Sequence, residues 1–234
     1  MSLLTICQDA ADAIGIARPS AVASSSDASA RQLGVFARQA LQEIADRHDW
    51  QQLVMEGSIT LATGDQDYAL PADFHRLIYD TTWDRTSNRQ QGGPITPQEW
   101  AFAKGFEFDT EVYRRFRIIG GEIEFADTIT AGDNGATVYF EYISSNKALN
   151  GSTPVANLTV DTYTSRISEH VVTLRVIALY KQAKGIQGWQ VDAKRFEDEL
   201  AKLAGWQKGS RSLCMDGGTR KADYPNIKDR DLGP

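Results

Sequence analysis

Hydrophobic residues recur with a helical period at both ends of this chain and with a period of two in its middle. Near the N-terminus, one apolar stripe has members spaced one, three or four residues apart: Leu33, Phe36, Ala37, Ala40, Leu41 and Ile44. Between about residues 57 and 143, apolar and polar residues alternate in short runs that are rich in strand-forming residues. Helices that flank a block of strands, without alternating with them, indicate the α+β class.

Two helices are predicted before the strands. The first covers residues 3–14, where Thr5 and Gln8 fit a capping box and Gly15 ends the helix. The second carries the apolar stripe and ends near residues 48–50. Its polar residues lie off the stripe, so we expect one buried face and one exposed face.

Two further helices are predicted after the strands. One is expected over residues 164–184, and its wide apolar surface predicts burial against several neighbours. The last is expected over residues 189–206, after glycines at 185 and 188. Its apolar face is marked by steps of four and three: Trp189, Ala193, Phe196, Leu200 and Leu203. The short connection between these helices favours an antiparallel pair.

The middle of the chain predicts six strands and one short helix. The strands are expected at residues 57–62 and 67–70 as one hairpin, at 77–83, at 114–119 and 122–125 as a second hairpin around Gly120 and Gly121, and at 137–143. The short helix should begin at Thr96, where Glu99 completes a capping box, and run to about Ala103. Residues 146–158 are expected to form a loop.

The economical arrangement of these elements is an antiparallel helical bundle, formed by the N- and C-terminal helices, with an inserted antiparallel β lobe. Residues 1–52 and 160–208 would form the bundle, and residues 53–159 the lobe with its one short helix. Residues 209–234 would form an extended C-terminal arm, because their few apolar groups and mixed charge cannot build a core.

Composition excludes several classes of protein. The formal net charge of −6 over 234 residues argues against a protein whose main role is to hold phosphates. No run of about 18 apolar residues is present, so we expect no membrane span, and no signal peptide opens the chain. We therefore expect a protein made in a cytosol, in which Cys7 and Cys214 are free thiols.

Chemistry-bearing residues form no convincing catalytic or metal site in the sequence. His48, His75 and His170 lack the spacing of a metal-binding pair, so we expect neither metal nor cofactor. Glu122 and Glu124 share a strand face, and a loop cluster holds Glu107, Asp109 and Glu111. Paired acids can cleave glycosidic bonds when an apolar pocket keeps one protonated, although acids in loops are usually just solvated.

A basic group spans residues 114–117, where Arg114, Arg115 and Arg117 surround a phenylalanine. These arginines have two interpretations. They could contact nucleic acid, or they could pair with the nearby glutamates across the second hairpin. We favour the pairing.

Several stretches of the chain resemble the head-to-tail adaptor family of tailed bacteriophages, also called tail accessory factors. The matching stretches are MSLLTICQDAADAIGIARP at the start, RHDWQQL, YALPADFHRL, GPITPQEW, RFRIIGGEIEF, FEYISSNKAL and RVIALYKQAKG. The resemblance covers about residues 1–205, and its motifs concern fold and packing, not catalysis.

The resemblance implies a structural virion protein at the head–tail junction, without enzymatic activity. Such adaptors form a ring beneath the portal, with one subunit for each portal subunit, which implies a dodecamer. The ring seals the DNA exit channel and presents a platform to the next tail component, a nozzle or tube protein. DNA would pass through its lumen without specific binding, and no membrane is involved.

The resemblance also implies roles for two sets of residues. A C-terminal extension in this family reaches up along the portal, so the arm is expected to lie on the portal or on a neighbouring subunit. Its anchors would be Leu213, Met215, Tyr224, Pro225, Ile227 and Leu232. The acids at Glu107, Asp109 and Glu111 would line the channel, where negative charge lets DNA slide without sticking.

Two other functions stay open at this stage. One is a virion enzyme that cleaves peptidoglycan, which a turnover assay would reveal. The other is a different structural role, as a tail-tube or head-completion protein, which would place the chain elsewhere in the particle.

Overall fold

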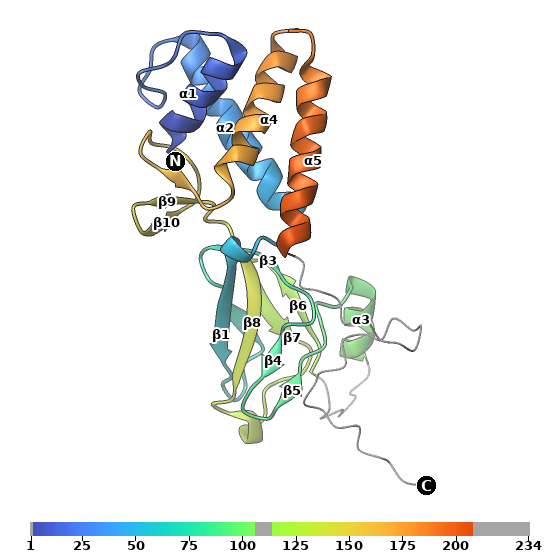
Figure 1. Cartoon of the computed structure of the whole chain (residues 1–234). Coiled ribbons are helices and arrows are strands. Elements are labelled where there is room, and N and C mark those ends of the chain that lie inside the picture. Colours follow the sequence, from blue (N-terminus) through green and yellow to red (C-terminus); the bar gives the residue numbers. More distant parts are fainter. Residues whose placement is uncertain (1, 106–113, 208–234) are drawn as a thin grey trace.

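The longer helices gather at one end of the molecule and the largest antiparallel sheet lies at the other (Figure 1). The computed structural model describes residues 2–105 and 114–207. The fold is mixed α+β, as the segregated sequence patterns predict. The helices within the described residues are α1 (Leu3–Ile14), α2 (Ala28–Arg47), α3 (Pro97–Gly105), α4 (Glu169–Ala183) and α5 (Trp189–Gln207), with short 3₁₀ helices η1 (Gln51–Leu53) and η2 (Ala131–Asp133).

The strands of the described residues form three antiparallel sheets. The strands are β1 (Val54–Thr60), β2 (Asp67–Ala69), β3 (Phe74–Leu77), β4 (Trp83–Asp84), β5 (Arg89–Gln90), β6 (Phe116–Ile119), β7 (Glu122–Phe125), β8 (Thr137–Ser144), β9 (Ala148–Asn150), β10 (Thr153–Val155) and β11 (Thr164–Ser165). The largest sheet follows the order β1-β8-β4-β5, and β3 also pairs with β8. The other two follow the orders β2-β7-β6 and β10-β9-β11.

Helix α4 lies at the centre of the helical end and contacts α1, α2 and α5. Its buried residues lie on every side, as the wide apolar surface predicts: Val171, Val172, Leu174, Val176, Ile177, Ala178, Leu179 and Tyr180. The predicted stripe of α2 faces this core, although Phe36 is only half-buried and meets the Tyr180 ring edge-on. Among the described residues, no helix is long and apolar enough to cross a membrane.

The sheets enclose a second hydrophobic cluster. Its fully buried aromatic residues are Phe116, Phe125 and Phe140, which come from β6, β7 and β8. The two largest sheets therefore share one core, even though they are separate hydrogen-bonded units. Strand β8 connects this core to the helices, because its Ile143 packs in the helical cluster and its Tyr142 in the sheet cluster.

Local helix signals were predicted well, with one error. The capping box of α3 is confirmed: Glu99 N–H donates to Thr96 Oγ1 at 3.2 Å, and Thr96 N–H donates to Glu99 Oε2 at 2.9 Å. The bond from Thr96 N–H, with a second one from the Thr96 hydroxyl at 3.0 Å, lowers the pKa of the Glu99 carboxyl. The capping box predicted for α1 is wrong, because Ser2 is the cap and accepts a hydrogen bond from Thr5 N–H. Thr5 itself lies inside the first turn.

The second predicted hairpin is confirmed, and the first is wrong. Strands β6 and β7 pair around Gly120 and Gly121, whose φ values of 62° and 88° suit the tight turn. Strand β1 pairs with β8, however, and β2 pairs with β7 in another sheet. The intervening turn passes the chain from one sheet to the other, and the Tyr68 hydroxyl binds Ala62 across it.

Three further boundaries differ from the prediction. The strand expected over 77–83 is divided into β3 and β4, because Asp80 adopts a left-handed φ of 63°. The loop expected over 146–158 contains β9 and β10. The helix expected from residue 164 begins instead at Glu169, because Thr164 and Ser165 pair with β9 as strand β11.

The buried Cys7 thiol should make the stability of the folded protein depend on pH in the alkaline range. Cys7 is free and fully buried in the helical core. Burial, reinforced by the negative charge of Asp161, raises its pKa from 9.0 to about 12. The folded state therefore favours the protonated thiol, so the contribution to stability is present below pH 9 and is lost as the pH rises toward 12.

We expect the free energy of unfolding to fall by about 1.4 kcal/mol per pH unit from this group within that window. Denaturant unfolding at about pH 8 and about pH 10 measures the effect. The Cys7→Ala variant, which lacks the buried thiol, should show a smaller fall. Equal falls in both proteins would contradict this account of Cys7.

Candidate functional site

The end of α5 is fastened to the junction between helices and sheets. Gln51 N–H donates to Gln207 Oε1 at 3.1 Å, and Gln51 Nε2 donates to the Gln207 carbonyl at 3.2 Å. Gln207 Nε2 also donates to Gln52 Oε1 at 2.9 Å. The C-terminal end of α5 is therefore held at a fixed point beside η1, the 3₁₀ helix that immediately precedes β1.

Arginine contacts hold this junction. Arg166 donates to the backbone carbonyls of Asn146, at 2.9 Å, and Gln52. Arg76 donates to the His48 carbonyl at 2.8 Å and forms an ion pair with Asp49. Gln52 links these contacts to Gln207, because its carbonyl accepts a hydrogen bond from Arg166 and its side chain accepts one from Gln207.

Trp206 is the most exposed large hydrophobic residue of the described chain. Its exposed fraction is 80%, and it lies in the last turn of α5, next to the fastened Gln207. Earlier in the same helix, Phe196 and Leu200 are buried in the helical core. Exposed tryptophans beside a fixed backbone are frequent energetic centres of protein interfaces. This end of α5 is the strongest candidate docking point.

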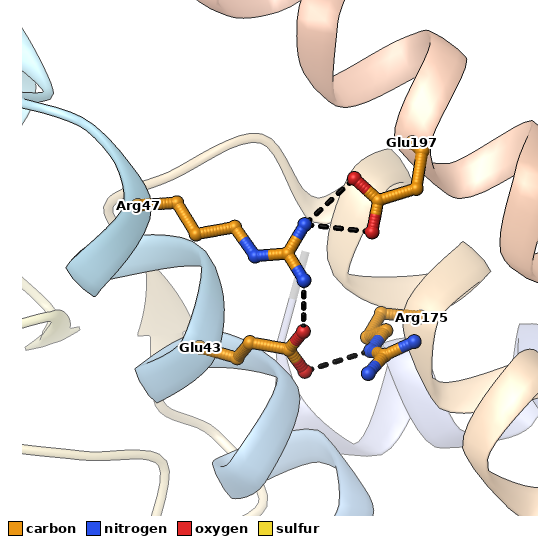
Figure 2. Close-up of polar contacts among 4 residues, drawn as sticks. All are labelled: Glu43, Arg47, Arg175 and Glu197. Carbon is orange, nitrogen blue, oxygen red and sulfur yellow. Dashed lines mark hydrogen bonds and ion pairs between the residues drawn. The ribbon is translucent and has the colours of Figure 1, made fainter.

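An ion cluster locks α5 against α2 and α4 (Figure 2). Arg47 Nη1 lies 2.7 Å from both carboxylate oxygens of Glu197. Arg47 also pairs with Glu43, whose second oxygen accepts a hydrogen bond from Arg175 at 2.8 Å. The hydrogen bond with Glu197 is the largest cause of the raised pKa of Arg47.

The same arginines cover a buried aromatic ring. The guanidinium of Arg175 lies 5.1 Å from the centroid of the Phe196 ring, and that of Arg47 lies 5.5 Å from it. Phe196 is fully buried. These contacts fix the helix that carries Trp206 in its last turn, because charge pairing and aromatic packing act at the same part of α5.

Two of the three arginines at residues 114–117 form ion pairs within the fold, and Arg115 is exposed. Arg117 pairs with Glu124 across the β6–β7 hairpin at 2.5 Å, and its guanidinium lies 4.1 Å from the centroid of Trp100. Arg114 pairs with Asp133. The favoured prediction, pairing with glutamate across the hairpin, is therefore confirmed for Arg117.

The two strand acids have different surroundings, and the described residues contain no cluster that could hold a metal ion. Glu124, one of the two strand acids, is held by Arg117, and Glu122 is exposed at the hairpin turn. Neither lies in the apolar pocket that a glycosidase acid needs. Within residues 2–105 and 114–207, no group of three or more His, Cys, Asp or Glu side chains could hold a metal ion.

Comparison with known protein families matches residues 1–220 to the SU10 adaptor protein family. The chain belongs to this family. The match confirms the resemblance to phage head-to-tail adaptors and identifies a phage structural adaptor, located in the virion. Adaptors of this kind interact with portal and tail proteins. A search of curated proteins finds no match.

Both sets of predicted site residues of the adaptor fall outside the described residues. The channel acids Glu107, Asp109 and Glu111 belong to residues 106–113, and the six arm anchors belong to residues 208–234. Cys214 also lies there. Their roles remain predictions.

Sequence reasoning missed the features that define the docking point of the adaptor. Trp206 does not continue the apolar steps of four and three along α5, which would have marked it as outward-facing. The contacts of Gln207 and Arg47 join residues about 150 positions apart, and no local pattern encodes them.

Proposed function

We propose that this adaptor forms a ring beneath the portal, seals the DNA exit channel and presents a platform to the next tail component. The observation that carries the proposal is the family match over residues 1–220. The ring is a dodecamer that matches the portal, and a nozzle or tube protein binds below it. The chain acts as a structural part of the virion and not as an enzyme, and DNA passes through the lumen without specific binding.

We further propose that three parts of the chain have different roles. Residues 1–52 and 160–208 form a helical bundle that supports the arm, and residues 53–159 form a β lobe. The packing of α4 against α1, α2 and α5 supports the first unit, and the separate hydrophobic cluster of the sheets supports the second. Residues 209–234 form the arm.

The arm docks on the portal or on a neighbouring adaptor subunit. Ordering it costs on the order of 1 kcal/mol per residue in backbone entropy, which its own sparse apolar groups cannot offset. The contacts that offset this cost are made by Leu213, Met215, Tyr224, Pro225, Ile227 and Leu232. The hydrogen bonds of Gln207 support this role, because a fixed starting point lowers the entropy lost on docking.

The acids at Glu107, Asp109 and Glu111 line the channel. A net charge of −6 on each copy supports this proposal, because repeated negative charge around a lumen repels the DNA backbone. A ring structure with these side chains on its outer surface would contradict it.

The mass of the purified protein tests the assembly. We expect a monomer or a weak oligomer in isolation, because α1, α2, α4 and α5 bury their apolar faces within one chain. Portal rings should trigger ring formation by supplying the missing contacts. A stable large ring that forms without portal would count against this proposal.

Trp206 gives a sharper test of the docking point. The Trp206→Ala variant should keep its stability within about 0.5 kcal/mol, because the side chain is exposed. Binding to portal rings should weaken by about 2 kcal/mol, roughly thirtyfold, if the indole is an interface centre. Val191→Ala is the matched control, since Val191 is 71% exposed at the other end of α5. Equal binding by both variants would exclude Trp206 from the docking point.

A further inference from the structure

Within residues 2–105 and 114–207, strand β1 leaves one complete edge of the largest sheet unpaired. In this part of the chain β1 pairs with β8 alone, in an unbroken register from Val54 opposite Ile143 to Thr60 opposite Thr137. It forms the outer margin of that sheet (Figure 1). With seven residues it is longer than every other edge strand in the described residues, which have four residues or fewer.

The pattern of hydrogen bonds between β1 and β8 shows which backbone N–H and C=O groups of β1 face outward. Leu61 N–H donates to the Ala136 carbonyl, so the odd-numbered residues of β1 point toward β8. In agreement, the N–H groups of Thr137 and Glu141, which lie opposite Thr60 and Glu56, turn away from β1 to threonine hydroxyls. The backbone groups of Glu56, Ser58 and Thr60 thus face outward, without a partner among the described residues.

This edge lacks the usual protection against strand pairing. Edge strands are commonly guarded by lysine, proline, a bulge or a covering segment. Strand β1 contains neither lysine nor proline, and its register has no bulge. Its one charge, Glu56, is bound by Arg85 at 2.6 Å, and Arg85 lies over the Tyr139 ring on the sheet face.

We infer that β1 pairs antiparallel with β1 of a second copy of this chain, which forms a two-fold dimer before assembly on a portal. The length of β1 favours β1 of a second copy as its partner, because no other open edge of the described chain offers seven residues of extended backbone. Charge selects the register. With Ser58 opposite Ser58 of the second copy, Glu56 lies opposite Thr60 and no like charges face each other.

In the dimer, the adaptor is held in a form that does not assemble into the ring. A two-fold contact uses the same surface on both copies, so it closes at two and cannot propagate around a ring. It satisfies the outward N–H and C=O groups of β1 and prevents open-ended strand pairing. The pairing of β1 does not depend on portal binding, whereas the role of the dimer before ring assembly rests on the proposed function.

Sedimentation equilibrium of the full chain over a concentration series tests the dimer. We expect a monomer–dimer equilibrium. In Ser58→Lys, two lysines would face each other, so the dissociation constant should rise at least about tenfold. The matched control is Ser87→Lys, which adds the same charge at an exposed turn residue and should leave the equilibrium unchanged.

Cross-linking decides the contact independently of how well the lysine variant folds. In a Cys214→Ser background, a short bismaleimide should link Ser58→Cys chains into dimers and should not link Ser87→Cys chains. Wild-type protein that stays monomeric at every concentration, or equal cross-linking at both positions, would overturn the inference. Portal binding by such a monomer would leave the proposed function standing.

Discussion

Removal of residues 210–234 is expected to leave the adaptor folded and to abolish its attachment to the portal. The core side chains of the helices end with Leu200 and the packed Leu203, and Gln207 makes the last contacts to the junction. The truncated chain should therefore keep its circular dichroism spectrum and its melting temperature. Loss of two or more buried anchors should weaken binding by about 3 kcal/mol or more, a factor of roughly a hundred or more.

Two full-length variants refine this test. Replacing Tyr224 and Ile227 together by alanine should remove about 1–3 kcal/mol of the binding free energy. Replacing the polar Ser212 and Thr219 by alanine is the control and should change it little. Normal attachment of a truncated, folded chain to portal rings, measured by co-sedimentation, would refute the proposed role of the arm.

The Phe196→Ala variant should cause the largest loss of stability in the helical half. Phe196 is fully buried, and both Arg47 and Arg175 lie over its ring. Truncating a buried phenylalanine costs about 3–5 kcal/mol, which in a chain of this size corresponds to a melting temperature lower by roughly 10 °C or more.

Two conservative variants distinguish the contribution of Phe196 packing to stability from the contribution of the ion pairs. Phe196→Leu retains most of the buried volume and should be much less destabilising than Phe196→Ala. Glu197→Gln keeps the ring and removes the charge that pairs with Arg47; since Glu197 is half-exposed, it should cost about 1 kcal/mol or less. An alanine variant as stable as the wild type in denaturant unfolding would disprove this account of the α5 contact.

Features set by local spacing were predictable from the sequence. The stripe of α2, the capping box at Thr96 and the glycine turn between β6 and β7 each depend on residues within a few positions of one another. Local chemistry also decided where α1 ends, because Gly15 adopts a φ of 81° that favours glycine.

Features set by distant contacts were not predictable. Strand β1 alternates like half of a hairpin, yet its partner β8 lies about 80 residues later in the chain. The same holds for the docking point. Nothing local in the sequence indicates that Gln207 binds Gln51. Trp206 becomes a candidate docking residue because that contact fixes the backbone beside its exposed side chain.

This adaptor should assemble on the portal in one copy for each portal subunit. Native mass spectrometry of purified portal rings mixed with excess adaptor measures that ratio directly. The account predicts a single complex with equal numbers of the two chains, twelve of each on a dodecameric portal. A complex with any other ratio, or no complex at all, would contradict it.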